Sequence, residues 1–154
     1  METKKIVLVG ETNVGKSSFV RKLEGKEILN DHVPTLGVEV IPIRRSLSQY
    51  VHKVFNIWDC AGDQRFEGLR DGYWVQADGA IIMVDCENSK TILTIEIWRT
   101  QLQRMIENKP IVVVLNKCEI LTQAQRGALE NALPDVVFIS CRNNINIEEV
   151  LNKF

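Results

Sequence analysis

The stretch Gly10-Glu11-Thr12-Asn13-Val14-Gly15-Lys16-Ser17 organises this chain, because two glycines bracket four variable residues and Lys-Ser follows them. A glycine-pinched turn of this kind points backbone N–H groups inward, and the helix that starts behind it adds positive potential for an anion. The apolar run Lys5–Val9 indicates a buried strand before the turn, and Ser17–Leu23 indicates a helix after it, which Gly25 ends. This context predicts a P-loop that holds a nucleotide triphosphate rather than a plain glycine turn.

The residues of this loop have separate expected tasks. We expect Lys16 to reach the β- and γ-phosphates and the Ser17 hydroxyl to ligate Mg²⁺. Asn13 suits a loop because asparagine tolerates left-handed backbone geometry. Further contacts to the nucleotide are expected from the loop and from the residue after it: Thr12, Asn13, Val14, Gly15 and Ser18.

Length and composition indicate a single domain over residues 1–154. The 154 residues are 45% hydrophobic and 25% charged with a net charge of −1, so charge does not favour nucleic acid or a membrane as the main partner. We find no signal peptide, membrane-spanning run or lipidation motif, and we expect an intracellular monomer. The four cysteines are far apart and show no CxxC spacing, which disfavours zinc.

The rest of the chain alternates between strand and helix patterns. Two strands, Val38–Ile43 and Gln49–Trp58, are expected to form an antiparallel hairpin around a turn at Arg44–Ser48. Further strands are expected at Gly79–Val84, Ile111–Leu115 and Val136–Ile139, and further helices at Lys90–Asn108, Thr122–Leu133 and Ile147–Phe154. The helix at Lys90–Asn108 shows the clearest apolar face, formed by Ile92, Ile95, Trp98, Leu102 and Met105, with Ser89 as its expected cap.

Alternating strands and helices predict an α/β fold: a mainly parallel six-stranded sheet with one antiparallel edge strand and helices on both faces. Ligands of such sheets bind at the carboxyl ends of the strands. Polar motifs follow several of the expected strands, so they should meet at one edge; these are Gly10, Asp59, Asp85 and Asn116.

The motif Asp59-Cys60-Ala61-Gly62 follows one of these strands. A carboxylate at Asp59 can hold Mg²⁺ directly or through water, and Gly62 lets a backbone N–H approach the terminal phosphate. A four-residue DxxG pattern is weak alone and becomes persuasive with a P-loop upstream. Thr35 is a candidate second hydroxyl ligand of the metal, although a lone loop threonine is more often simply solvated.

The motif Asn116-Lys117-Cys118-Glu119 is similar to the guanine-reading NKxD element, with glutamate in place of aspartate. The carboxylate has to accept two parallel hydrogen bonds from guanine. The extra methylene of Glu119 leaves two alternatives open: a small shift that keeps guanine binding, or relaxed base choice. Ser140-Cys141-Arg142 is similar to the SAK element that supports the base from the other side.

The order of these motifs over nearly the whole chain resembles the Ras-superfamily small GTPases, and hence the P-loop NTPase, small G-protein fold. Two runs resemble the Ran family more closely: Thr35–Val40, and Phe66–Tyr73 with its continuation to Met83. The resemblance implies GTP/GDP and Mg²⁺ as cofactors, with switch segments around Thr35 and over residues 60–72. It also implies nucleocytoplasmic transport in the cytoplasm and nucleus, with importin-β-type receptors, a GTPase-activating protein and an exchange factor as partners.

Several positions depart from this family. Asp63 stands where the water-orienting glutamine is expected, with Gln64 one step further along. Together with Thr35 these residues are the candidate catalytic group, and a shorter, anionic side chain at Asp63 favours slow GTP hydrolysis. Thr12 replaces a small residue, His32 replaces an aromatic one, and the acidic tail of Ran is missing. The sequence thus leaves two readings: a slowly hydrolysing switch, or a non-hydrolysing Ran mimic that occupies the partners of Ran.

Overall fold

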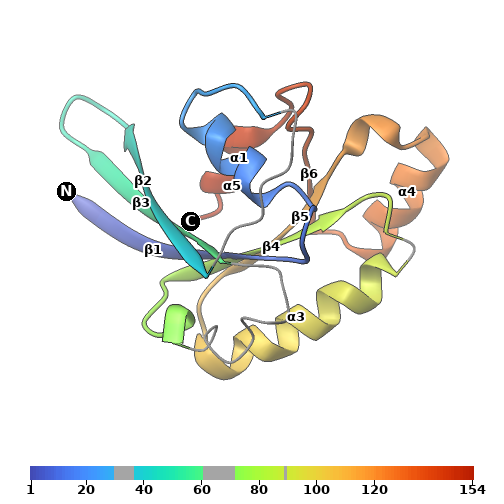
Figure 1. Cartoon of the computed structure of the whole chain (residues 1–154), viewed down its shortest axis with the longest axis horizontal. Helices are drawn as coiled ribbons and strands as arrows, with labels where there is room; N and C mark the ends of the chain where they lie inside the picture. Colours follow the sequence, from blue (N-terminus) through green and yellow to red (C-terminus); the bar gives the residue numbers. More distant parts are fainter. Residues whose placement is uncertain (30–36, 61–71, 89) are drawn as a thin grey trace.

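The computed structural model describes residues 1–29, 37–60, 72–88 and 90–154. Its centre is one six-stranded sheet with the strand order β2-β3-β1-β4-β5-β6 (Figure 1). The strands are β1 Glu2–Val9, β2 Val38–Ser46, β3 His52–Cys60, β4 Gly79–Asp85, β5 Ile111–Asn116 and β6 Val137–Phe138. The helices are α1 Lys16–Leu23, α3 Thr91–Met105, the short 3₁₀ helix η2 Cys118–Ile120, α4 Gln123–Ala132 and α5 Ile147–Leu151.

The pairing of the strands confirms the predicted sheet. β2 and β3 are antiparallel, whereas the pairs β1–β3, β1–β4, β4–β5 and β5–β6 are parallel. The parallel strands therefore end at a common edge, where Asp85 pairs in register with Asn116. The structure is therefore an α/β fold with a mainly parallel six-stranded sheet and one antiparallel edge strand, as the sequence predicts.

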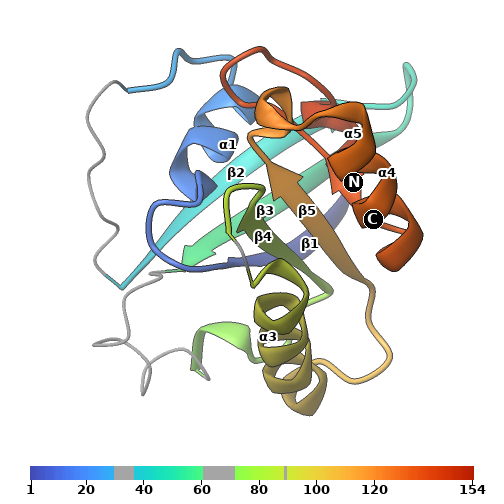
Figure 2. The ribbon, with the colours of Figure 1, turned by 90° about the vertical axis from the view of Figure 1, so that its right-hand side faces the viewer.

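The side chains of β1 divide the core into two layers, because successive residues of a strand point to opposite faces. Ile6 and Leu8 pack with Phe19 of α1 and with α5 on one face. Val7 and Val9 pack with Trp98 of α3 on the other face. Figure 2 shows α1 and α5 on one side of the sheet and α3 on the other. The central strand is thus buried on both faces, which explains its unbroken apolar sequence.

The hairpin is confirmed, but its predicted turn is wrong. Arg44, Arg45 and Ser46 continue β2 and pair with Val54, Lys53 and His52. The chain turns at Leu47–Val51 instead, where the Ser48 hydroxyl accepts hydrogen bonds from the backbone N–H groups of Tyr50 and Val51. Arg45 belongs to the strand because its guanidinium bonds Glu148 of α5 and the Leu23 carbonyl at the end of α1. These contacts are long-range, and no local pattern reveals them.

Helix α3 is confirmed, and its predicted apolar face is wrong at one residue. Ile95, Trp98 and Leu102 are buried as expected, but Ile92 is 49% exposed. Thr91 and Thr94 occupy the buried positions of the first turn instead, and the Thr91 hydroxyl donates to the Asn88 carbonyl. Small hydroxyl side chains fit against the sheet there because they satisfy their hydrogen bonds locally. The expected cap, Ser89, lies outside the described residues.

The last two helices differ in how well they match the prediction. Helix α4 is confirmed, and Thr122 and Gln125 form a capping box at its start. Helix α5 ends at Leu151 rather than continuing to Phe154. The ring of Phe154 lies against Gly79, and its backbone oxygen accepts hydrogen bonds from Lys4 and Lys53. Within the described part of the chain, no helix combines the length and the apolar character needed to cross a bilayer.

Candidate nucleotide-binding site

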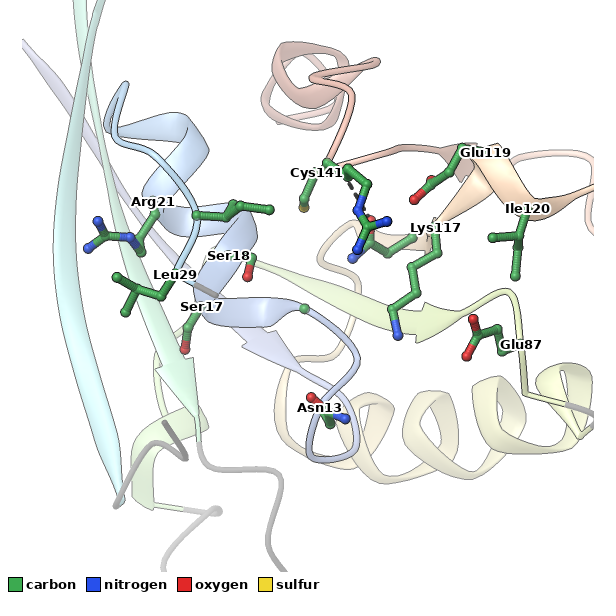
Figure 3. Close-up of a pocket in the computed structure, with 14 residues that line it drawn as sticks. Asn13, Ser17, Ser18, Arg21, Leu29, Glu87, Lys117, Glu119, Ile120 and Cys141 are labelled. Carbon is green, nitrogen blue, oxygen red and sulfur yellow. Dashed lines mark hydrogen bonds between the residues drawn. The ribbon is translucent and has the colours of Figure 1, made fainter. Parts of the chain in front are cut away.

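A cavity of about 350 Å³ opens at the carboxyl edge of the sheet. In Figure 3, Ser17 and Ser18 of α1 lie at one end, and Lys117, Glu119 and Ile120 lie at the other. Nine of the fifteen residues that the sequence predicted to contact the nucleotide come together here. The lining residues are Asn13, Gly15, Ser17, Ser18, Arg21, Ile28, Leu29, Glu87, Asn116, Lys117, Glu119, Ile120, Cys141 and Arg142.

The loop between β1 and α1 has the backbone geometry of an anion cradle. Gly15 is left-handed, with φ 104°, and directly precedes the first turn of α1. A Cβ atom at Gly15 would collide with the side chain of Asn116, so only glycine fits. Asn13 also has a positive φ, 71°, as its tolerance for this region predicts. The N-terminus of an eight-residue helix therefore faces the cavity behind a glycine turn.

Lys16 is held inside this loop. Its ammonium donates hydrogen bonds to the carbonyl oxygens of Gly10 and Glu11, each at 2.8 Å, and the residue is 7% exposed. Burial lowers the pKa of Lys16 to about 8, although Asp59 and other nearby negative groups raise it. A buried cation without a carboxylate in direct contact is costly for the fold. An anion that binds beside the Lys16 ammonium would therefore offset the cost of burying this charge.

The lowered pKa of Lys16 predicts a pH-dependent stability of the nucleotide-free protein. The unfolded chain binds a proton at Lys16 up to pH 10.5 and the folded chain only up to about pH 8, so this residue adds stability as pH rises between these values. The Lys16→Met variant lacks this titrating group. From pH 8 to pH 10.5 we therefore expect the free energy of unfolding of the wild type to rise relative to that of Lys16→Met by on the order of 3 kcal/mol. Urea unfolding of both proteins over this range measures it, and a constant difference would contradict it.

Ser17 and Asp59 form a second polar pair at the same edge. The Ser17 hydroxyl donates to Asp59 Oδ2 at 2.7 Å, although the residues are 42 positions apart. Asp59 is 1% exposed, and burial raises the pKa of its carboxyl against the opposing effects of Ser17 and Lys16. Its second oxygen, Oδ1, has no hydrogen-bond partner among the described residues. A buried carboxylate oxygen without a donor, beside a hydroxyl, matches the ligands that Mg²⁺ takes.

Asn116 connects three parts of the site. Its side-chain amide donates to the Val14 carbonyl at 3.0 Å, and its side-chain oxygen accepts from the backbone N–H of Cys141 at 3.2 Å. Its backbone oxygen accepts from the N–H of Cys86. Asn116 is 3% exposed, so these bonds are made away from water. The residue thus fixes the P-loop against the Ser140-Cys141-Arg142 segment.

Lys117 and Glu119 lie at the far end of the cavity and differ in how they are held. Lys117 is left-handed, and its ammonium forms an ion pair with Asp85 at 2.5 Å. Burial lowers the pKa of Lys117, but the hydrogen bond and charge of Asp85 outweigh it, so the pKa lies above its usual value. Glu119 is exposed on η2 and makes no hydrogen bond or ion pair with any described residue. Its carboxylate is therefore available to a ligand.

The segment after β6 supports the cavity from the other side. Ser140 is fully buried, and its hydroxyl accepts from the backbone N–H of Asn143. Cys141 is 4% exposed, and burial raises the pKa of its thiol to about 12, which keeps it neutral and unreactive. Arg142 is exposed and lines the cavity. Ser140 therefore stabilises the turn after β6, whereas Cys141 and Arg142 line the cavity.

Some predicted site residues lie away from the cavity, and some lie outside the described residues. Thr12 is exposed, while Val14 is buried and faces Asn116 through its carbonyl. Thr35, Gly62, Asp63, Gln64 and His32 lie outside the described residues, so their predicted roles stay predictions. No group of three or more His, Cys, Asp or Glu side chains suited to a metal occurs in the described ranges. Any cation here would depend on the Asp59–Ser17 pair and on oxygens of its ligand.

Sequence reasoning missed several cavity residues. Ile28, Leu29 and Ile120 form apolar parts of the lining, and Arg21 and Glu87 form polar parts. Ile28 and Leu29 follow α1 in a segment without periodicity, so no pattern distinguishes them from ordinary loop residues. Asp85 is different: its position directly after a strand predicted that it would lie at this edge, and its ion pair with Lys117 confirms it.

The family model described as "Ras of Complex, Roc, domain of DAPkinase" matches residues 5–119. The matched range begins in β1 and includes the P-loop, Asp59, Asp85 and the Asn116–Glu119 motif. Those segments are the ones that build most of the cavity. The Roc domain is a Ras-like GTPase domain, and such domains bind guanine nucleotide as a switch. The chain therefore belongs to the Roc family and is a GTP-binding, Ras-like small GTPase of the Ras superfamily.

Proposed function

We propose that the protein is a slowly hydrolysing, Mg²⁺-dependent guanine-nucleotide switch. The observation that carries this proposal is the cavity that the P-loop, Asn116, Lys117, Glu119 and Cys141 border together. In this arrangement the P-loop N–H groups and Lys16 hold the phosphates. Asn116, Lys117 and Glu119 hold the base, with Ser140, Cys141 and Arg142 supporting it. Arg21 and Glu87 are further polar residues of the cavity lining.

The Mg²⁺ part of the proposal rests on Asp59 and Ser17. The Asp59 oxygen without a partner among the described residues and the adjacent hydroxyl supply hard oxygen donors at the P-loop. Bound Mg²⁺ would neutralise part of the phosphate charge. Thr35 is the proposed third protein ligand, on the sequence resemblance alone. The Lys16 ammonium bonds the loop carbonyls of Gly10 and Glu11, and its proposed role is at the phosphates rather than at the metal.

Slow hydrolysis is proposed because Asp63 directly follows the Asp59–Gly62 motif. A carboxylate there is anionic beside a triphosphate and lacks the amide N–H that a glutamine donates. Gln64 is one residue further along, and catalytic placement tolerates little error. The GTP-bound form would then persist unless a partner completes the catalytic group.

A second candidate function is a non-hydrolysing binding module that resembles Ran and occupies Ran's partners. Two substitutions favour it: Asp63 stands where the water-orienting glutamine is expected, and Thr12 replaces a small residue of the P-loop. The Ran-like runs make importin-β-type receptors, a GTPase-activating protein and an exchange factor the proposed partners, in the cytoplasm and nucleus. The oxygen donors at Asp59 and Ser17 support the switch over this module, because a metal site serves hydrolysis as well as binding.

Replacing Asp63 by glutamine is expected to raise the single-turnover rate of GTP hydrolysis by about tenfold or more, because correct placement of the attacking water by the glutamine amide contributes at least that much. The protein is loaded with GTP and Mg²⁺, denatured at set times, and the released nucleotide is identified by chromatography. Asp135→Gln is the matched control, since Asp135 is exposed after α4. Fast hydrolysis by the wild type, or no gain in Asp63→Gln, would remove Asp63 as the cause of slow turnover.

A further inference from the structure

A second cavity of about 490 Å³ lies between the start of α3 and helix α4 (Figure 1). Its volume falls within the range of about 300–1,000 Å³ that is typical of sites for small molecules. This cavity and the nucleotide cavity share none of their described lining residues. A ligand bound between α3 and α4 would therefore occupy a site of its own.

The lining of this second cavity is mainly aliphatic. Helix α3 contributes Ile92 and Leu93, and the chain from η2 into α4 contributes Leu121, Ala128 and Leu129. Ile92 and Leu93 are 49% and 57% exposed, so apolar surface meets water here. Removing such surface from water is favourable. The cavity therefore suits a ligand with an apolar body.

The neutral polar side chains of the lining already have partners within the protein. Asn88 Oδ1 accepts from the backbone N–H of Lys90, and the Thr91 hydroxyl donates to the Asn88 carbonyl. Gln125 Oε1 accepts a backbone N–H in the capping box of α4. Burial raises the pKa of the Cys86 thiol to about 12, which keeps it neutral. These four side chains therefore do not require a polar ligand.

Lys90 gives the lining its charge. Its side chain is exposed and forms no ion pair with any described residue. No Asp or Glu occurs among the described residues that line this cavity. A lysine stem covers apolar surface while the ammonium at its end stays in water. The complement of this lining is therefore an apolar body that carries one negative charge.

We propose that the cavity between α3 and α4 binds a free amphiphilic carboxylate, a small molecule with an unbranched apolar chain and one carboxylate, such as a medium-chain fatty acid. The chain packs against Ile92, Leu93 and Leu129, and the carboxylate pairs with Lys90. The inference does not rest on the proposed nucleotide switch, because no residue of the nucleotide cavity takes part in it.

The first measurement is a titration of the ¹⁵N-labelled full chain with sodium decanoate, below the concentration at which decanoate forms micelles. We expect saturable shift changes at the amides of Ile92, Leu93 and Leu129, and none at Ser17 or Ser18. Calorimetry with hexanoate, octanoate and decanoate then measures how affinity depends on chain length. Each added methylene should tighten binding by about fourfold, because burying it removes apolar surface from water.

Ala128→Phe tests the contact with the chain. The ring would occupy the cavity, so decanoate should bind about tenfold more weakly or worse, since its methylenes lose their burial. Ala124→Phe is the matched control, because Ala124 is also exposed on α4 but does not line the cavity. This control should bind decanoate as the wild type does. Circular dichroism of both variants checks that the fold is kept.

Lys90→Gln tests the contact with the carboxylate. We expect decanoate to bind about threefold to fivefold more weakly, the effect of losing one exposed ion pair. Binding of decanol, which has the same chain and no charge, should not change. The substitution does not weaken α3, because Lys90 is its N-cap residue and a cation is unfavourable at a helix N-terminus.

Several results would overturn the inference. One is a titration in which no amide of the cavity shifts, or in which the shifts centre on Ser17 and Ser18. Another is an affinity that depends neither on chain length nor on Lys90. A third is a dimer in sedimentation velocity that Ala128→Phe dissociates, which would show that a second copy of the chain covers this face. Failure to bind nucleotide would contradict the proposed switch and leave decanoate binding unaffected.

Discussion

Lys16→Ala is expected to lower the affinity for GTP by about a hundredfold or more, the largest functional effect of any single change in the chain. The ammonium of Lys16 bonds the carbonyl oxygens of the P-loop, and it is buried where the phosphates are proposed to bind. Removing one partner of a buried charged contact costs about 3 kcal/mol or more. Equilibrium titration with fluorescent GTP measures the loss.

Two features make this experiment decisive. Lys26→Ala removes the same charge from an exposed residue whose ion pair is with Glu24, so it should leave the affinity unchanged. Loss of the fold does not explain the expected result either, since burial already makes the charged form of Lys16 costly, and the nucleotide-free variant should be no less stable than the wild type. Unchanged affinity in Lys16→Ala would refute the phosphate-binding role of the loop.

Gly10→Ala is expected to lower the free energy of unfolding by about 3 kcal/mol. A Cβ atom at Gly10 would collide with the backbone oxygen of Met83 in β4, and a backbone group in the middle of the sheet has no room to move. Gly10 also has a φ of 155°, which L-residues rarely adopt. Urea denaturation measures the change.

Gly127→Ala is the matched control, with the opposite sign. Gly127 lies inside α4, and an added Cβ there meets no atom within 4 Å. Alanine favours the helix over glycine by about 1 kcal/mol, so this variant should be more stable than the wild type. Equal effects of the two substitutions would show that the close approach of the P-loop to β4 is not what requires glycine at position 10.

The sequence predicted the sheet and the central site because their signals are local. A buried strand, a glycine turn and a helix follow one another between Lys5 and Leu23, and Asp85 and Asn116 each follow an apolar strand. Parallel pairing alone then brings them to one edge. What failed were features fixed by distant partners, such as Arg45, which extends β2 because it bonds Glu148.

The walls of the cavity could not be predicted for the same reason. Ile28 and Leu29 belong to a segment without periodicity, and only the folded chain shows that they face the same space as Glu119. The burial of Thr91 in place of Ile92 is a further case, in which a hydroxyl bond to Asn88 prevailed over hydropathy. Hydropathy ranks side chains by their cost of leaving water, and it ignores hydrogen bonds that remove this cost.

The bonds of Asn116 have a consequence for protein synthesis. They join Val14 to a residue 102 positions away and then to Cys141, a further 25 positions along. A chain emerging from the ribosome can complete α1 and the hairpin early, and the Asn116 amide nitrogen can then bond Val14, but the side-chain oxygen of Asn116 lacks the Cys141 N–H until the segment after β6 has been made. The link between the P-loop and the segment after β6 is therefore completed last, so a nascent chain that ends before Cys141 should bind nucleotide more weakly than the full chain.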